Sequence, residues 1–434
     1  MWGEQMKISP INLTIDELPD KWYNITADFP SPMSPPKDPV EGESRLKLLP
    51  EFFAAEALRQ EMSQERWIRI PDEVKELYIH VGRPRPLYRA YRLEKYLKTP
   101  AKIYYKREDL SPTGSHKVNT ALAQLYYVAK EGYERVTTET GAGQWGSALA
   151  HGAALMGLKC TVYMVRFAYN LKPGRRTIMK YYGAECLPSP SNRTTFGKKL
   201  LKENPNHNGS LGIAVSEGIE DALKHDDTVY CLGSVLNHVL LHQTVIGQEV
   251  IKQFEKIDET PDIMFACLGG GSNFGGFTIP MMGLRLKKKV DTRFVACQSE
   301  VSANLVNGKY EYDFGDAAEQ TPLLKMFTLG HKKEMHPIYA EGLRYHAAAP
   351  VLSYLRNLGI IEAKVYPRDE RVIFEAAKIF MRTEGFIPAP ESAYAIRATI
   401  DEALEARRKN EKRVIAMNIS GHGFVDLEAY SKFI

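Results

Sequence analysis

The sequence predicts an α/β protein with two three-layer domains, each a largely parallel sheet covered by helices on both faces. Three observations support this fold class. Short β-branched or aromatic segments alternate with helical segments from residue 103 onward. Glycine-rich loops follow several of these strands, at the edge where such sheets bind ligands. The chain has 434 residues, 44% of them hydrophobic, which suffices for one large or two medium cores.

The alternation can be followed element by element. In the first half it predicts strands at 103–106, 135–138 and 160–164, with helices at 119–130 and 147–156. In the second half it predicts strands at 263–267, 294–298 and 414–418, with helices at 239–254, 274–286, 351–358, 371–383 and 393–409.

The first 89 residues are expected to form an N-terminal extension that packs on both domains. The proline-rich stretch SPMSPPKDPV at 31–40 cannot be helical, whereas the apolar residues at 46–62 have helical spacing. We expect residues 90–240 to form an N-terminal α/β domain and residues 241–434 a C-terminal one.

Composition excludes several classes of partner. Lys and Arg number 57 against 53 Asp and Glu, so a net charge of +4 gives no nucleic-acid signal and a small-molecule partner is expected. No apolar run approaches the roughly 18 residues that span a bilayer, so no membrane contact is expected. Five cysteines without CxxC spacing indicate reduced core residues, and the opening MWGEQMKISP lacks the apolar stretch of an export signal. These features predict a cytoplasmic protein.

A first candidate loop, SPTGSHKVN, lies between a predicted strand and a predicted helix at 111–119. A lysine that forms a Schiff base must be partly buried near positive charge, so that it loses its proton. His116 and the first helical amides could give Lys117 that environment. A surface lysine in a polar loop is the alternative.

A second loop, ETGAGQWG at 139–146, directly follows a predicted strand. Its three glycines would let backbone N–H groups converge into a nest for a carboxylate at a helix start. Glu139 would then lie beside the bound acid, as a general base or a partner of a developing cation. The alternative is a plain tight turn.

A third loop, LGGGSN at 268–273, suits a phosphate held by backbone amides and short polar side chains. Phe274 stands where a GxGxxG motif needs its last glycine, and no Lys-Ser or Lys-Thr follows, so neither a dinucleotide fingerprint nor a P-loop is present. A structural turn remains the alternative.

A fourth loop, NISGHG at 418–423, follows the last predicted strand. A neutral hydroxyl such as that of Ser420 could face a pyridine nitrogen and leave it unprotonated. On its own this loop is better explained as a terminal turn. The four loops together, however, are the parts that a pyridoxal 5′-phosphate (PLP) enzyme requires.

At this point the sequence resembles the tryptophan synthase β family, with GSHKVN, ETGAGQ, GGGSN and SGxG in the family's order. The resemblance runs from about residue 80 to the C-terminus. It implies the fold type II PLP architecture, with the cofactor in the cleft between two α/β domains. It also implies a lyase that condenses L-serine with indole to give L-tryptophan.

The resemblance implies a role for each matching residue. Lys117 would be the Schiff-base lysine and proton shuttle, and Glu139 would assist hydroxide loss and activate indole. Ser420 would face the pyridine nitrogen and Glu384 would flank the ring. The cofactor would also be bound by His116, Asn119, Gly269, Gly270, Gly271, Ser272 and Asn273, and the substrate carboxylate by Thr140, Gly141, Ala142, Gly143 and Gln144.

Two departures from the common family pattern stand out. Trp145 replaces a histidine, which together with the long N-terminal extension resembles the second, divergent class of β chains, for which α-subunit contact would be absent or weak. Arg344 falls where the family places an acid for the serine hydroxyl. We therefore expect Arg344 either to favour an anionic donor such as O-phosphoserine, or to pair with Glu139 or another local carboxylate as a closing latch.

Three other functions fit the sequence less well. Another fold type II enzyme, such as a serine or threonine dehydratase, a serine deaminase, a threonine synthase or a cysteine synthase, would lack the ETGAGQ block. A catalytically silent PLP-binding protein would not need both Lys117 and Glu139. A nucleotide-dependent oxidoreductase fails on the glycine motif.

The remaining expectations come mainly from the family. They are a homodimer and a monovalent cation (Na⁺ or K⁺) whose site the sequence does not place. No other metal is expected, because the spacing of His331, His336 and His346 fits no zinc pattern.

Overall fold

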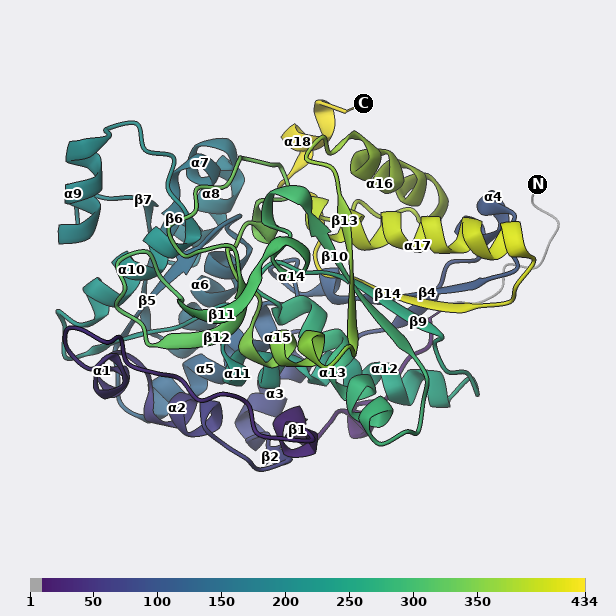
Figure 1. The fold of residues 1–434 in the computed structure, drawn as a ribbon, viewed down its shortest axis with the longest axis horizontal. Coiled ribbons are helices and arrows are strands. Elements are labelled where there is room, and N and C mark those ends of the chain that lie inside the picture. Colours follow the sequence, from purple (N-terminus) through teal and green to yellow (C-terminus); the bar gives the residue numbers. More distant parts are fainter. Residues whose placement is uncertain (1–9, 434) are drawn as a thin grey trace.

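The computed structural model describes residues 10–433, so the opening segment from which we predicted the absence of an export signal lies almost wholly outside it. Two main sheets make up the fold, side by side in Figure 1. The six-stranded sheet contains, in spatial order, β13 (Ile361–Tyr366), β10 (Arg293–Ser299), β9 (Ile263–Cys267), β14 (Val414–Ile419), β4 (Lys102–Arg107) and β3 (Leu87–Arg89). The four-stranded sheet contains β7 (Glu185–Ser189), β6 (Lys159–Val165), β5 (Arg135–Thr140) and β8 (Thr228–Tyr230). Within these two sheets, all neighbouring strands are parallel except β3 and β4, which confirms the predicted α/β class.

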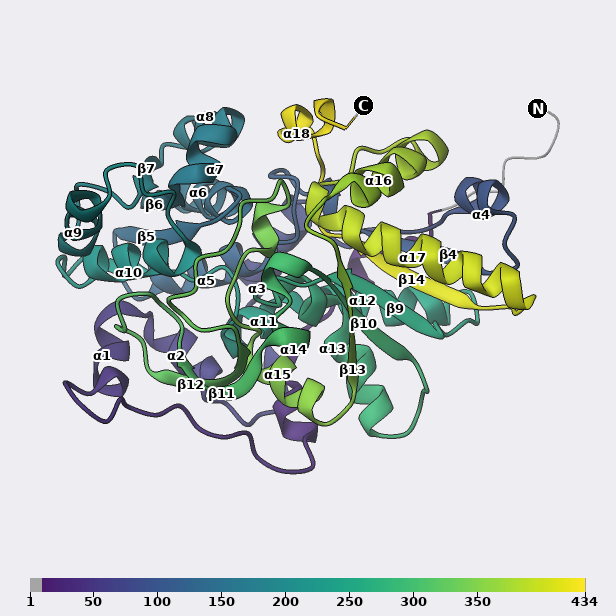
Figure 2. The ribbon, with the colours of Figure 1, turned by 45° about the horizontal axis from the view of Figure 1, so that its top comes forward.

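Helices cover both faces of the six-stranded sheet (Figures 1 and 2). Successive side chains of a strand point to opposite faces, so Ile263 and Phe265 of β9 enter one apolar cluster and Met264 enters the other. One face is covered by α4 (Tyr91–Leu97), α16 (Arg371–Glu384) and α17 (Pro390–Lys409), and the other by α12 (Val245–Glu255) and α13 (Ser272–Leu286). Strands buried on both faces explain the nearly continuous apolar runs in the sequence.

The four-stranded sheet is covered in the same way. Val162 of β6 faces α6 (Gln144–Met156), whereas Tyr163 donates a hydrogen bond to Asp221 of α10 (Leu211–Ala222) at 2.9 Å. The other helices of this half are α5 (Val118–Lys130), α7 (Arg166–Leu171), α8 (Pro173–Tyr181) and α9 (Thr195–Glu203). The sequence pattern missed α7 to α10, β7 and β8, because they are short or have mixed polarity.

The N-terminal extension is more structured than we expected. Strand β1 (Lys21–Tyr23) pairs with β2 (Trp67–Arg69), and the predicted helix at 46–62 is in fact two helices, α1 (Arg45–Phe52) and α2 (Ala55–Glu61). The break arises because Phe53 and Ala54 are extended, and Glu131 accepts hydrogen bonds from the amides of Ala55 and Glu56 at 2.7 and 2.9 Å. The extension lies along one side of the molecule in both ribbon views, with α3 (Asp72–His80) leading into β3.

The predicted helix at 239–254 is also two helices, α11 (Asn237–Gln243) and α12. Thr244 separates them: its hydroxyl donates to the Leu241 carbonyl at 2.7 Å and accepts the Tyr23 amide at 3.0 Å. A hairpin of β11 (Lys309–Phe314) and β12 (Leu323–Thr328) was not predicted. The remaining elements are α14 (Asn304–Asn307), α15 (Pro350–Asn357), α18 (Leu427–Ser431) and the 3₁₀ turns η1 (Ile15–Glu17), η2 (Ile25–Asp28), η3 (Glu108–Leu110), η4 (Glu300–Ser302) and η5 (Glu341–Leu343).

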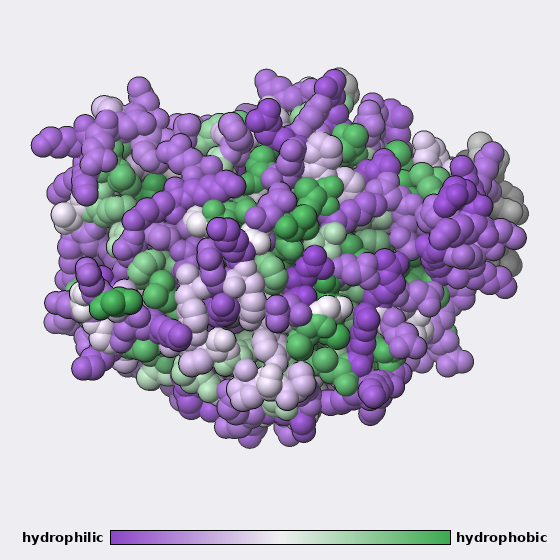
Figure 3. Space-filling view, in the orientation of Figure 1, coloured by the Kyte–Doolittle hydropathy of each residue, from purple (hydrophilic) through white to green (hydrophobic). Residues whose placement is uncertain are grey.

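The chain crosses between the two sheets. Strand β4, which we expected in the 90–240 domain, pairs with β14 of the six-stranded sheet, and the division at residue 240 stays a prediction. Within residues 10–433, no helix is both long enough and apolar enough to cross a membrane. The face in Figure 3 is mainly hydrophilic with scattered apolar patches, and scattered apolar side chains are ordinary on a protein surface.

Candidate active site

A cavity of about 350 Å³ lies where loops from both sheets meet, beyond the carboxyl ends of β5, β9 and β14. This is the edge at which ligands bind in parallel sheets. Most of the residues singled out from the sequence line this one cavity, namely His116, Lys117, Glu139, Thr140, Gly141, Ala142, Gln144, Gly269, Gly270, Gly271, Ser272, Asn273 and Ser420.

Lys117 immediately precedes α5, and its side chain enters the cavity. Its Nζ donates hydrogen bonds to the Gly233 carbonyl at 2.7 Å and to Ser272 Oγ at 3.2 Å. Burial lowers the pKa of Lys117 to about 8, although Glu139, Cys267 and Glu391 act in the opposite direction. A fraction of the amine is therefore neutral near pH 7 and able to attack an aldehyde.

Glu139 lies near the end of β5 and is 3% exposed. Its carboxylate accepts hydrogen bonds from the Tyr230 hydroxyl and, at 3.2 Å, from the Gly233 amide. Burial nevertheless raises the pKa of Glu139 to about 7. A carboxyl with this pKa can both give and take a proton at neutral pH.

The predicted carboxylate loop begins α6. Gly143 has φ +90°, which favours glycine, and a side chain there would meet Arg175 at 2.8 Å. Gly143 itself does not line the cavity, whereas Gly141, Ala142 and Gln144 do. The start of a 13-residue helix and the loop before it thus line the cavity, the position in which backbone N–H groups bind an anion.

The predicted phosphate loop lies at the start of α13. A Cβ on Gly269 would meet the Gly342 carbonyl at 2.6 Å, and one on Gly270 would meet Ser234 Oγ at 2.7 Å. His116 Nε2 lies 3.1 Å from Ser272 Oγ, and burial lowers the pKa of His116 to about 3, so the ring is neutral. Backbone and neutral hydrogen-bonding groups thus form a cradle that fits a phosphate.

Ser420 lies beyond the end of β14. Its Oγ is 2.8 Å from Ser392 Oγ and 3.7 Å from Cys267 Sγ, and burial raises the pKa of that thiol to about 12. The lining therefore offers only neutral groups at this point. An amine, an anion cradle and a neutral hydroxyl around one cavity fit the aldehyde, phosphate and pyridine nitrogen of PLP.

Glu384 does not reach the cavity. Its carboxylate accepts the Leu93 amide at 2.9 Å and the Tyr105 hydroxyl at 3.3 Å. Glu391, a few residues further along in the first turn of α17, does line the cavity and accepts hydrogen bonds from the Gly342 amide at 2.9 Å and from Gln144 Nε2 at 3.2 Å. Both acids fall in the segment EGFIPAPES, and only the geometry of the turn between α16 and α17 separates them.

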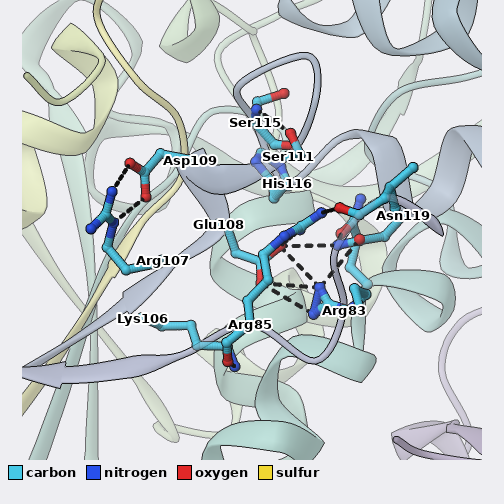
Figure 4. A network of polar contacts seen from close by, with 12 residues as sticks. Arg83, Arg85, Lys106, Arg107, Glu108, Asp109, Ser111, Ser115, His116 and Asn119 are labelled. Atoms are coloured by element: carbon cyan, nitrogen blue, oxygen red, sulfur yellow. Dashed lines mark hydrogen bonds and ion pairs between the residues drawn. The ribbon is translucent and has the colours of Figure 1, made fainter. Parts of the chain in front are cut away.

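Asn119 also lies outside the cavity, in a buried charged cluster (Figure 4). It donates to Gln243 Oε1 at 2.9 Å and accepts from Arg83 at 3.2 Å. Arg83 and Arg85 both donate to Glu108, and the charged groups of all three are fully buried. Asn119 therefore connects the start of α5 to this cluster instead of contacting a cofactor from the cavity wall.

Arg344 lies behind the cavity wall. Its Nη1 donates to both carboxylate oxygens of Glu341, at 2.8 and 2.6 Å, and Glu341 lines the cavity. The partner of Arg344 is therefore a local carboxylate, as in the latch alternative, but not Glu139. In residues 10–433, no group of three or more His, Cys, Asp or Glu is arranged to hold a metal ion.

Sequence reasoning missed part of the lining. Tyr230 is the last residue of an unpredicted strand, β8, and Gly233 lies in the loop that follows it, while Glu341 lies in a loop-rich stretch with no periodicity. The helical spacing at 46–62 was seen, but nothing in it showed which apolar face meets the cavity. That wall comprises Leu46, Leu49, Pro50, Phe53, Leu58 and Met62 of the extension, together with Leu211, Val215, Ile219, Leu232, Val235 and Leu236.

Comparison with known proteins agrees with this site. Residues 80–421 match the family described as "Pyridoxal-phosphate dependent enzyme". "Tryptophan synthase beta chain 2" of Methanothermobacter thermautotrophicus is 53% identical over 98% of this chain and 99% of its own length. The protein of the same name from Pyrococcus furiosus is 53% identical, with 96% and 93% covered, and "Tryptophan synthase beta chain" of Pyrococcus horikoshii is 52% identical, with 100% and 94% covered. The predicted resemblance is confirmed.

Two solved structures show the same fold. A fungal L-serine ammonia-lyase from Rhizomucor miehei has a TM-score of 0.59 at 15% identity, covering 80% of this chain and 97% of that one. A PLP-dependent aspartate racemase has a TM-score of 0.57 at 18% identity, covering 83% and 98%. The predicted fold type II architecture is confirmed, and the chain belongs to the family of pyridoxal-phosphate-dependent enzymes.

Proposed function

We propose that this chain is a tryptophan synthase of the β type, a PLP-dependent lyase that replaces the β-substituent of a serine donor with indole. The observation that carries the proposal is the position of Glu139. Its carboxyl, with a pKa of about 7, faces the same cavity as Lys117 and an extensive apolar wall. A base beside a lysine and an apolar chamber fits an apolar acceptor that must lose a proton.

PLP, when bound, acts as the electron sink that makes the α-proton acidic and the β-substituent able to leave. Lys117 is placed to move the proton at the donor's α-carbon. Glu139 is placed to give a proton to a departing hydroxide, and then to take one from indole. The carboxylate loop orients the donor through backbone N–H groups at the start of α6.

The apolar wall supports indole as the acceptor. Indole has a single polar group, its N–H, and the rest of its surface is apolar. Phe53 of the extension packs edge-on against Tyr230 at 5.8 Å between ring centroids, and Tyr230 donates to Glu139. The extension thus contributes apolar surface near the base and limits access of water, which a dehydratase would not require.

The donor is L-serine or O-phospho-L-serine, and the two donors make different demands on the Arg344–Glu341 ion pair. The charge of Arg344 is neutralised by the buried carboxylate of Glu341 in the cavity wall. To bind a phosphorylated donor, Arg344 would have to leave Glu341 and bind the phosphate instead. A guanidinium can do this because it forms bidentate hydrogen bonds with either group. Comparing the specificity constants for the two donors in wild type and Arg344→Ala decides this, because an unchanged ratio excludes selection by Arg344.

The main experiment measures tryptophan and pyruvate from the same reaction of indole with each donor. Wild type should form tryptophan, and Glu139→Gln should lose at least about a hundredfold of that activity, the usual contribution of a general base. Pyruvate formation that is indifferent to indole would favour a dehydratase. A protein that binds PLP and forms neither product would be a catalytically silent one.

Further properties follow from the resemblance to tryptophan synthase β chains. We propose a cytoplasmic homodimer with weak or absent α-subunit contact and a monovalent cation, Na⁺ or K⁺, at a site still to be located. Sedimentation of the purified chain, with and without a candidate α subunit, tests the assembly, and activity in K⁺, Na⁺ and a bulky organic cation tests the ion.

A further inference from the structure

Trp145 takes no part in the chemistry proposed above, yet it packs against the residue that separates the two reactive side chains. We propose that Trp145 is a positioning residue, which fixes the Gly233 backbone between Lys117 and Glu139 and so keeps those side chains from pairing with each other. The inference rests on the proposed function, because it assigns Trp145 to the control of Lys117 and Glu139.

Gly233 bridges the two reactive groups through its own backbone. Its carbonyl accepts the hydrogen bond from Lys117 Nζ at 2.7 Å, and its amide donates to Glu139 Oε1 at 3.2 Å. The carbonyl and the amide belong to successive peptide planes joined at one Cα. A rotation at Gly233 would therefore move the two partners of Lys117 and Glu139 relative to each other.

The Trp145 ring is what requires a glycine at position 233. The φ of Gly233 is not in the left-handed region, so its backbone conformation would accept other residues. A Cβ there would instead lie 2.4 Å from Trp145 Cγ and within 2.7 Å of two further indole carbons. The indole face thus lies directly on the Gly233 Cα and limits the freedom that a glycine would otherwise have.

Trp145 is itself held in place. It is 3% exposed, and its Nε1 donates to Thr138 Oγ1 at 2.6 Å. Thr138 in turn donates to the Cys231 carbonyl at 2.5 Å. The preceding residue of the loop, Leu232, is fixed at both its amide and its carbonyl by the Gln124 side chain. At Gly233 the fixed contact is the Trp145 ring.

The separation matters because the two groups carry opposite charges in one cavity, and among residues 10–433 no ion pair joins them. The titratable groups that face Lys117 are Glu139, Cys267, Glu391 and the neutral His116. Those that face Glu139 are Lys117, Tyr230, Cys231 and Tyr345. Direct pairing would raise the pKa of Lys117 and lower that of Glu139. The amine would then stay charged and the carboxyl would lose its ability to donate a proton near pH 7.

Cofactor capture by the full-length apoprotein tests the proposal without any turnover. PLP is added at a series of pH values, and the rate of the absorbance change reports the neutral fraction of Lys117. The wild-type midpoint should lie near the lysine pKa of about 8. Trp145→Leu, which removes the flat ring, should raise the midpoint by about one unit or more, the usual effect of a new ion pair.

Four further variants separate positioning from packing. Trp145→Phe keeps a ring over Gly233, so its pH midpoint of capture should shift by no more than about a third as much as that of Trp145→Leu. Trp22→Leu is the matched control. Trp22 is a buried residue of the extension that packs against His242 of α11, away from the cavity, so the midpoint of this variant should be unchanged. Gly233→Ala should impair capture, and adding it to Trp145→Ala should cause no further loss beyond that of Trp145→Ala alone, because the methyl then has room.

Several outcomes would overturn the proposal. One is a folded Trp145→Leu variant whose pH midpoint of capture equals that of wild type. Another is a Trp22→Leu variant whose midpoint shifts as much as that of Trp145→Leu. A third is a Gly233→Ala, Trp145→Ala double variant in which the losses of capture from the two substitutions add. If Trp145→Leu does not fold, the Gly233 pair of variants decides alone. Capture needs neither indole nor donor, so a chain that captures PLP as described but makes no tryptophan refutes only the proposed function.

Discussion

The hydrogen bond from Tyr230 to Glu139 offers a quantitative test of the base. Tyr230 is 2% exposed, and its hydroxyl stabilises the charged form of the Glu139 carboxyl. A hydrogen bond to a buried charge contributes roughly 1.5–3 kcal/mol, and one pKa unit corresponds to about 1.4 kcal/mol. Tyr230→Phe should therefore raise the pKa of Glu139 from about 7 by roughly one to two units.

The sign of the effect on activity follows from the state that indole activation requires. Glu139 takes a proton from indole only when ionised, so activity should rise with pH through its pKa. In Tyr230→Phe that rise should move to higher pH. At pH 7 the ionised fraction falls roughly fivefold for a shift of one unit and roughly fiftyfold for two.

The assay is the pH profile of kcat/KM for indole at saturating donor. Tyr163→Phe is the matched control, because Tyr163 lies directly opposite Glu139 in the β5–β6 register but donates to Asp221. The control profile should keep its midpoint. A Tyr230→Phe midpoint equal to that of wild type, in a folded holoprotein, would refute the assignment of this limb to Glu139.

The remaining predictions concern stability and cofactor binding. The pKa of Glu139 is raised on folding from 4.5 to about 7, so this carboxyl stabilises the folded apoprotein at pH values below 4.5, and that stability is lost as the pH rises to about 7. The loss corresponds to about 3 kcal/mol in the free energy of unfolding. In Glu139→Gln, chemical denaturation at a series of pH values should no longer show this loss. Glu108→Gln should cost about 3–5 kcal/mol, because it leaves buried guanidinium groups without their partner, whereas Glu362→Gln, at an exposed pair with Arg293, should cost less than about 1 kcal/mol. Gly271→Ala should weaken PLP affinity in a direct titration, because φ is +123° there and a Cβ would meet Leu352 at 2.5 Å; affinity like that of wild type would argue against the cradle.

Much of the fold could be predicted from the sequence, because parallel strands are apolar on both faces and glycine loops mark their ends. Strand β9 was predicted with its observed bounds, and the strand and helix on either side of the Lys117 loop agree with structure to within one residue at each end. The pattern was weaker where tertiary contacts decide. Glu131, far along the chain from 46–62, caps α2 and so fixes the break between α1 and α2.

The candidate site, too, could be predicted only where tertiary contacts do not decide which residues line it. Lys117, Glu139 and the GGGSN loop each lie at a strand end, so motif and position predicted them together. Glu384 and Glu391 stand in one short segment, and only the path between α16 and α17 determines which of them reaches the cavity. The pairing of Arg344 with Glu341 likewise depends on the η5 turn, which has no sequence periodicity.

The cofactor's point of attachment tests the central claim most directly. The purified holoprotein is reduced with borohydride, digested, and the lysine that carries the pyridoxyl group is located by mass spectrometry. The structure predicts modification of Lys117 alone, at one group per chain, and none in Lys117→Ala. Modification of a different lysine, or undiminished labelling of Lys117→Ala, would contradict the assignment of this cavity as the PLP site.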